Sequence, residues 1–347
     1  LIAFWFEPTP ERATAYLAAL APVVAELRRR EESASVRRRG SVVPDLGLPR
    51  VLGHYLLTAV LGAGGDGLVL RAEDTESGAA VAIKMPAYGE YTLAQLLETW
   101  HPNMVRIVDS GMALDPPNFW CAMELGDETL DDVLKRQRGA PLARSEALTI
   151  FSACCDAVAF LHAHHIYRWS AHQRNVVRVG NVWKITDHGR VCILLDRDNP
   201  ALAEWREALI GGFRLAPNEA ALGADWLLSH HLLDVPFKAG VGLRDPDCER
   251  RLRQDDLARL GGLLVDVLGG RRWDYFYRAI VRQPYCSARY RLTGDPLVDV
   301  ELTAILNRCW RGDAGGAPAL ANGYNTDQSS YDNPRDLLSD VESAFRH

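Results

Sequence analysis

Hydrophobic and polar positions are spaced differently in the first and second parts of the chain. Between residues 49 and 127, apolar residues gather in short runs bounded by turn residues, which predict strands at "HYLLTAVLG", "GLVLRAED", "AAVAIKM", "MVRIVDSG" and "NFWCAMEL". One short helix is expected among them, at "TLAQLLETW". Between residues 128 and 347, helical spacing predominates in "LDDVLKRQ", "SEALTIFSACCDAVAFLHAHH", "DDLARLGGLLVDVL", "LVDVELTAILNRCW" and "PRDLLSDVESAF". This order predicts an α+β protein with a small antiparallel β-rich lobe, a larger α-helical lobe and a cleft between them.

Residues 1–48 form an N-terminal extension with a different pattern. Thr9 and Pro10 favour a helix start, because a hydroxyl N-cap is followed by proline at the first helical position. The basic segment "SASVRRRGSVVPDLGLPR" then predicts a flexible linker. Because the helix would carry an apolar stripe, we expect it to dock on the following domain or on a neighbouring chain. The chain begins at Leu1, so we expect it to be part of a larger protein.

Composition narrows the class of protein. The net charge of −6 over 347 residues gives no overall basic character, so no nucleic-acid partner is expected. The arginines at 28–30 and 37–39 fit a solvated linker better than a contact with nucleic acid or lipid. Seven cysteines without paired metal spacing suit reduced thiols in a cytoplasmic protein. The longest apolar runs are too short to cross a bilayer, so no membrane span is expected.

Candidate chemistry begins in the stretch "LGAGGDGLVL". Gly62, Gly64 and Gly67 are spaced G-x-G-x-x-G, and a second strand follows them where a dinucleotide-binding fold would place a helix. Glycines between antiparallel strands let the backbone approach phosphates closely, although a hairpin without a ligand would fit the same letters. The next strand ends in "VAIK" at Lys84, which would offer an ammonium to those phosphates; the alternative is an exposed strand lysine.

These motifs and those that follow resemble the eukaryotic-like Ser/Thr protein kinase family over roughly residues 50–345. "WCAMEL" is similar to the hinge strand, "YRWSAHQRN" to the catalytic loop, "KITDHG" to the metal-binding turn and "DDLARLGGLLVDVLGG" to a helix anchored by Asp256. "FRLAPNEAAL" is similar to the end of the activation segment. The resemblance implies a bilobal protein-kinase-like fold that binds ATP and Mg²⁺. The implied nucleotide-binding residues are Gly62, Gly64, Gly67, Val69, Ala82, Lys84, Met123, Glu124, Leu125 and Val177, and the implied metal-binding residues are Asn175 and Asp187.

The catalytic loop departs from the family at its central position. Ser170 stands five residues before Asn175, where the family has the aspartate that accepts the substrate hydroxyl's proton. A shifted register that places Trp169 there also supplies no carboxylate. A serine hydroxyl is too weak a base near neutral pH, and His172 is the possible substitute base, against the simpler interpretation of a solvated loop histidine.

Other differences from the kinase family also point to a catalytically impaired site. The family's helix C glutamate would fall near Thr92, and neither Glu90 nor Glu98 is in register, so we do not expect an ion pair with Lys84. Trp169 replaces the arginine that would pair with a phosphorylated activation segment. We therefore expect a pseudokinase that binds Mg·ATP and serves as a regulatory or scaffolding module for a protein partner or for the remainder of a larger chain. The alternatives are a divergent active Ser/Thr kinase and an interaction domain that binds no nucleotide.

Overall fold

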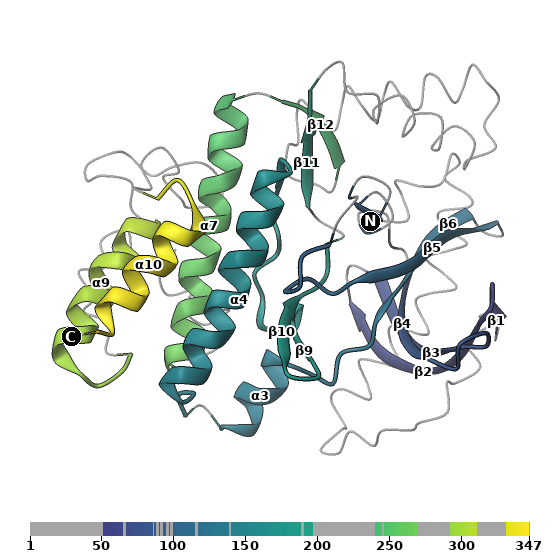
Figure 1. Ribbon diagram of the computed structural model, residues 1–347, viewed down its shortest axis with the longest axis horizontal. Helices are drawn as coiled ribbons and strands as arrows, with labels where there is room; N and C mark the ends of the chain where they lie inside the picture. The colour runs from purple at the N-terminus through teal and green to yellow at the C-terminus, as the bar shows by residue number, and fades with distance from the viewer. Residues whose placement is uncertain are drawn as a thin grey trace. The chain divides into compact units, whose positions relative to one another are not determined.

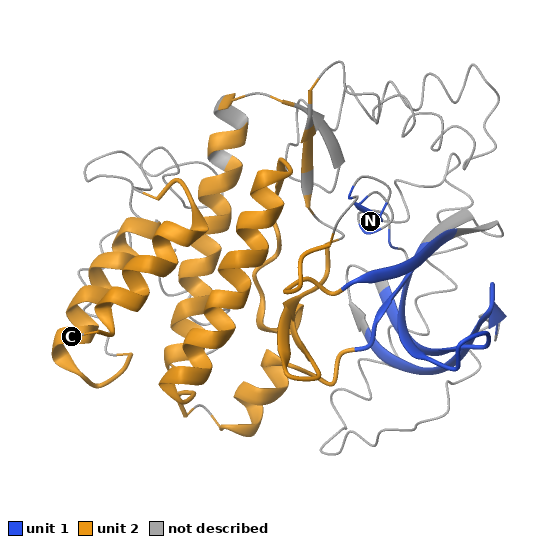
Figure 2. Ribbon diagram, viewed as in Figure 1, with its two compact units in different colours: residues 1–98, 106–125, 198–234 blue, residues 99–105, 126–197, 235–347 orange. Residues whose placement is uncertain are grey.

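The computed structural model describes residues 51–64, 67–85, 87, 90, 93–94, 97, 100–114, 117–138, 140–188, 191–196, 240–244, 246–269, 292–310 and 331–346. The chain divides into two compact units (Figure 2). Residues 1–98, 106–125 and 198–234 belong to the first unit, and residues 99–105, 126–197 and 235–347 belong to the second. The predicted extension at residues 1–48, with its helix from Thr9 to about Glu32, and the segment "FRLAPNEAAL" lie outside the described residues.

The first unit contains a six-stranded antiparallel sheet with the order β1-β2-β3-β4-β6-β5, which curls in Figure 1. Its strands are β1 (Val51–Leu52), β2 (Tyr55–Gly64), β3 (Gly67–Asp74), β4 (Ala80–Met85), β5 (Ile107–Leu114) and β6 (Pro117–Glu124). Each follows one of the predicted apolar runs except the two-residue β1. Alternate residues of a strand point to opposite faces, so each of these runs can supply a core face and a second face.

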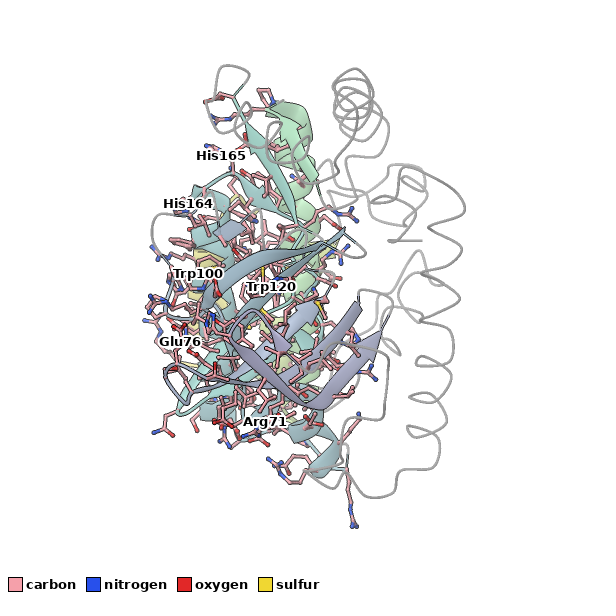
Figure 3. All side chains as sticks on the ribbon, turned by 90° about the vertical axis from the view of Figure 1, so that its right-hand side faces the viewer. Arg71, Glu76, Trp100, Trp120, His164 and His165 are labelled. Carbon is pink, nitrogen blue, oxygen red and sulfur yellow. The ribbon has the colours of Figure 1, made fainter. Side chains whose placement is uncertain are left out.

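The inner face of the sheet holds the core of the first unit. The buried side chains that form this core are Leu52, Tyr55, Leu68, Leu70, Ala72, Val81, Ile83, Met85, Trp120 and Ala122. The rings of Tyr55 and Trp120 meet edge to face with centroids 5.7 Å apart, and Trp120 is labelled in Figure 3. Trp120 also fixes the residue at position 111, because a Cβ on Gly111 would lie 2.6 Å from its ring. Close packing against an indole therefore requires this strand glycine.

The second unit is built mainly from helices. These are α3 (Leu130–Arg136), α4 (Arg144–Ala163), α7 (Pro246–Gly269), α9 (Pro296–Trp310) and α10 (Pro334–Ala344). Helix α4 packs beside α7 and α10 (Figure 1). By length and composition α4 could cross a membrane, but 56% of its most apolar window is buried inside the fold, as in the core helix of a helical domain. No other helix among the described residues passes that test.

Short strands complete the second unit. One sheet has the order β10-β9-β7, with β7 (Glu128–Thr129), β9 (Val176–Val179) and β10 (Val182–Ile185). Another has the order β12-β11-β8, with β8 (Ile166–Tyr167), β11 (Cys192–Leu195) and β12 (Gly240–Leu243). The helical pattern after residue 128 did not predict these strands, because two to four residues are too few to show an alternation.

The fold confirms the α+β class, with a curled antiparallel sheet and a set of helices consistent with a kinase-like fold. The predicted helices in the second unit are all present, but α7 begins at Pro246 and not at Asp255. Its added first turns bury Glu249 at 8% exposure beside Leu252 at 0%. A buried charged residue interrupts the apolar spacing, so the sequence pattern alone did not indicate that these turns face the core.

Candidate nucleotide-binding residues in the two units

The glycine-rich stretch forms the end of the β2–β3 hairpin. Gly62 pairs with Val69, and Gly64 pairs with Gly67, with a bulge between Val60 and Gly62. A Cβ built on Gly62 meets no atom within 4 Å, and its φ is not in the left-handed region. Neither packing nor backbone strain among the described residues therefore requires glycine here. The absence of a side chain at this position suits the close approach of a ligand.

Four candidate residues share the face of the sheet that lies opposite the core. Val69 pairs with Lys84 across β3 and β4, and Ala82 pairs with Met123 across β4 and β6. Their sequence neighbours Leu68, Leu70, Val81, Ile83, Met85 and Ala122 all belong to the core. Strand alternation therefore places Val69, Ala82, Lys84 and Met123 together on the other face. An apolar surface with one ammonium group would suit a purine ring and its phosphates.

Lys84 is not an exposed strand lysine, and it does make an ion pair. Its Nζ lies 2.6 Å from Oε1 of Glu90, and the two side chains are 6% and 0% exposed. The expectation that Glu90 is out of register was therefore wrong. That expectation placed the family's glutamate near Thr92, whereas the residue that pairs with Lys84 is Glu90, six positions along the chain.

Cys121 lies in the same environment as the ion pair. It pairs with Lys84 across β4 and β6 and is fully buried. Burial, together with the charge of Glu90, raises the pKa of the Cys121 thiol far above its ordinary value. The thiol is therefore protonated and chemically quiet at physiological pH.

The predicted hinge residues follow at the end of β6. Glu124 donates its backbone N–H to the Arg106 carbonyl at 3.0 Å, and its carboxylate accepts the Arg106 N–H at 3.2 Å. Leu125 comes next and is partly exposed. In the second unit, Val177 pairs with Thr129 and Lys184 and is 9% exposed. A Cβ on Gly126 would lie 3.2 Å from Cβ of Val177, so the chain passes closely over that valine.

The predicted catalytic loop is anchored by two neighbouring carboxylates of α7. Asp256 Oδ2 accepts the Arg168 backbone N–H at 2.8 Å and lies 2.9 Å from Nε2 of His162. Arg168 has φ of 64° and places its guanidinium on Asp255, with 3.1 Å between Nε and Oδ2. Burial raises the pKa of Asp256, and the bond to His162 opposes that effect. The sequence resemblance had identified Asp256 as an anchor, but it had not indicated the role of Asp255.

The side chain of Asn175 is hydrogen-bonded to the backbone of Ser170. The Asn175 side-chain Nδ2 donates to the Ser170 carbonyl at 2.9 Å, and Asn175 N–H donates to the His172 carbonyl at 2.7 Å. The bond from Nδ2 orients the amide and leaves its Oδ1 as the atom that could bind a cation. Thr186, next to Asp187, donates its N–H to the Asn175 carbonyl at 2.8 Å. The structure therefore links the chain at Asn175 to the chain beside Asp187, the two predicted metal-binding residues.

His172 has a local structural role. Its Nδ1 accepts the Arg174 backbone N–H at 3.2 Å and so caps the short 3₁₀ helix η2 (Gln173–Asn175). When Nδ1 accepts a hydrogen bond, the neutral ring carries its proton on Nε2. In this tautomer Nε2 is a donor, which argues against His172 as the base in this arrangement of the loop.

Two polar contacts of this unit had no signal in the sequence. Gln173, within the predicted catalytic loop, donates to Asp266 at 2.6 Å. Glu249 accepts the Tyr167 hydroxyl at 2.6 Å and pairs with Arg244 and Arg253. Burial works against ionisation of Glu249, but the hydrogen bonds from Tyr167 and Arg244 outweigh it and lower its pKa to about 2. Both carboxylates are distant in sequence from the loop, so no spacing rule could find them.

The three histidines near the end of α4 go to separate partners. His162 contacts Asp256, His164 Nδ1 lies 2.9 Å from the Phe160 carbonyl, and His165 Nδ1 lies 3.3 Å from Glu249. His164 and His165 are labelled in Figure 3. Among the described residues no cluster of three or more His, Cys, Asp or Glu side chains has the geometry of a metal site.

Comparison with known proteins gives partial similarities to Ser/Thr kinases. No protein-family model matches the chain. The chain is 30% identical over 156 residues to serine/threonine-protein kinase PrkC of Bacillus subtilis (strain 168), covering 40% of this chain and 23% of that protein. It is 28% identical over 149 residues to serine/threonine-protein kinase max-2 of Caenorhabditis elegans, covering 40% and 22%. It is 27% identical over 139 residues to cyclin-dependent kinase D-1 of Oryza sativa subsp. indica, covering 37% and 31%.

The chain therefore spans less than a third of the length of these curated relatives. The similarities support a protein-kinase-like relationship, in agreement with the curled antiparallel sheet and the helices of the fold.

Proposed function

We propose that this chain is a pseudokinase module that binds Mg·ATP and regulates or scaffolds a protein partner. The observation that carries the binding proposal is the sheet face in the first unit. There the buried Lys84–Glu90 pair lies on the same face as Val69, Ala82 and Met123. The ammonium would neutralise phosphate charge, and the apolar neighbours would contact adenine. Glu124 and Leu125 would contribute the hinge contacts to the purine, and Val177 would be the second unit's apolar contact.

The candidate metal-binding residues have suitable chemistry. Asn175 and Asp187 offer amide and carboxylate oxygens, which are the donors that Mg²⁺ prefers, and phosphates and waters would complete its shell. The hydrogen bond from Asn175 to Ser170 leaves the amide oxygen oriented for such a contact. A bound Mg²⁺ would neutralise phosphate charge. The chain's own contribution would be to hold these two oxygens in fixed positions.

The residue at the base position limits catalysis. Ser170 offers a hydroxyl where phosphoryl transfer needs a carboxylate to orient the attacking oxygen and to take its proton. A positioned base contributes about 10²–10⁴-fold to rate, so transfer to protein would be very slow. Regulation would then come from nucleotide binding itself, which a partner or the remainder of a larger chain could read. The cytoplasmic location also stays a prediction.

A divergent active kinase is the second candidate, and one observation favours it. The ion pair between Lys84 and Glu90 removes one of the departures that had argued for an inactive site. Positioning and charge neutralisation provide most of the rate of phosphoryl transfer, and Asn175 and Asp187 are both present. The third candidate, an interaction domain without nucleotide, would leave the side-chain-free surface at Gly62 without a ligand.

Thermal unfolding with and without Mg·ATP tests the binding proposal. Nucleotide at 100 times its Kd should add about 2.7 kcal/mol of stability. Gly62→Val fills an open position, so it should keep the unfolding temperature of the free protein and weaken the response to Mg·ATP. Gly78→Asn is the matched control, because this turn glycine also has open space around it and asparagine tolerates its φ of +71°. A wild-type protein without any shift in millimolar Mg·ATP would favour the nucleotide-free interaction domain.

A further inference from the structure

Trp169 is buried in the catalytic loop and makes a specific contact there. Its side chain is among the largest fully buried ones, with 1% exposure. Its indole Nε1–H donates to the backbone carbonyl of Thr186 at 2.9 Å. Thr186 directly precedes Asp187, so the indole contacts the peptide group that leads into the candidate metal-binding residue.

This contact closes a ring of hydrogen bonds within the second unit. Thr186 N–H donates to the Asn175 carbonyl, and Asn175 Nδ2 donates to the Ser170 carbonyl. Ser170 is covalently next to Trp169, whose own carbonyl accepts the Ala171 N–H at 2.9 Å. Both backbone polar groups of Thr186 are therefore held by the catalytic loop, the N–H by Asn175 and the carbonyl by Trp169.

The hydrogen bond from Trp169 to the Thr186 carbonyl restrains the backbone of Asp187. The Thr186 carbonyl and the Asp187 nitrogen belong to one planar group, so holding that oxygen fixes the plane from which φ of Asp187 is set. Asp187 has φ of 62°, a left-handed conformation that is uncommon for residues other than glycine and that aspartate tolerates better than most. On the other side of Asp187, the fully buried ring of His188 meets the ring of Trp100 edge to face. The turn is thus held on both sides.

We propose that Trp169 is a positioning residue that holds Asp187 in its cation-binding orientation. The role in binding a cation rests on the proposed Mg·ATP binding, whereas the contact between Trp169 and Thr186 does not depend on it. The kinase resemblance places at this position an arginine that would form an ion pair with a phosphorylated activation segment. A buried indole bonded to a backbone carbonyl carries no charge and needs no phosphate. The orientation of Asp187 in this chain is therefore built in and does not depend on modification.

The test uses Trp169→Phe, which keeps an aromatic ring and removes the N–H donor. Trp183→Phe is the matched control, because Trp183 is another buried tryptophan of the same unit, at 6% exposure. Hydrogen–deuterium exchange of the free protein is measured in peptides that contain residues 186–188. Loss of one buried hydrogen bond should speed exchange there by about tenfold in Trp169→Phe, and the control should leave it unchanged. Unchanged exchange in folded Trp169→Phe would overturn the proposal.

Nucleotide titration supplies a second readout that a merely structural tryptophan would not move. Trp169→Phe should weaken affinity for Mg·ATP by about tenfold and leave affinity for ATP in EDTA within about twofold. Equal losses with and without Mg²⁺ would contradict positioning of a metal-binding residue. If the wild type binds no Mg·ATP, the proposed function fails, and the exchange result still decides the positioning. If Trp169→Phe does not fold, benzothienylalanine at position 169 replaces it, because it keeps the indole shape without the N–H.

Discussion

The ion pair between Lys84 and Glu90 gives the sharpest prediction for stability. The two atoms lie 2.6 Å apart, and the side chains are 6% and 0% exposed. We consider Lys84→Met, Glu90→Leu and the double variant, because these replacements have similar length and no charge. Each single variant removes this pair and keeps one of its two buried charges, whereas the double variant keeps neither.

The magnitudes follow from that difference. Removing one partner of a buried pair costs about 3–5 kcal/mol, because the remaining charge has lost both water and its partner. Replacing both partners with apolar side chains of similar volume is often close to neutral. The two single losses should therefore not add in the double variant, and the coupling energy should be several kcal/mol. An exposed pair would give at most about 1 kcal/mol.

Urea denaturation of the four proteins, followed by circular dichroism, measures this coupling. We expect large losses in both single variants and a double variant within about 1 kcal/mol of the wild type. Losses below about 1 kcal/mol in both single variants would refute a buried ion pair. The result also affects how binding assays are read. A Lys84→Ala variant that fails to bind ATP could have lost its fold, so Gly62→Val is the better probe of nucleotide binding.

Three further outcomes are expected. Glu249→Gln should lower the free energy of unfolding at pH 7 by about 2–3 kcal/mol, because the pKa of Glu249 is lowered to about 2 in the folded protein. The difference from wild type should shrink as the pH falls from about 4.5 towards 2. A difference that does not depend on pH would contradict this prediction. Gly111→Ala should cost about 1–3 kcal/mol in urea denaturation, since its Cβ would lie 2.6 Å from the Trp120 ring, and a neutral result would disprove this packing. Thr129→Ala removes the capping box of α3 and should cost about 1 kcal/mol; an unchanged urea midpoint would contradict this role.

Much of the fold could be predicted because its signals are local. Strand alternation in "GLVLRAED" and "AAVAIKM" set both the core face and the face of Val69 and Lys84, since register and alternation need only neighbouring residues. Helices α4, α9 and α10 follow their apolar spacing for the same reason. The first turns of α7 could not be predicted, because Glu249 is buried through partners at positions 167, 244 and 253.

In the candidate site, too, contacts that depend on how the chain folds back could not be predicted from local patterns. The motif letters named Lys84, Asn175 and Asp187 as candidates, but the family's spacing placed the partner of Lys84 near Thr92, whereas Glu90 makes the ion pair. At position 169 the sequence indicates only that a tryptophan replaces the family's arginine. Its bond to the Thr186 carbonyl depends on how the loop folds back, which no pattern of residue types records.

Transfer of labelled γ-phosphate from ATP to protein is the most direct test of the pseudokinase account. Wild type, Ser170→Asp, His172→Ala and Asp187→Asn are compared at a nucleotide concentration that saturates binding. The account predicts bound nucleotide and no transfer above background in the wild type, with little gain in Ser170→Asp. Robust wild-type transfer that disappears in Asp187→Asn would contradict it. Loss of transfer in His172→Ala as well would show that transfer needs this histidine, either as the base or as the cap of η2.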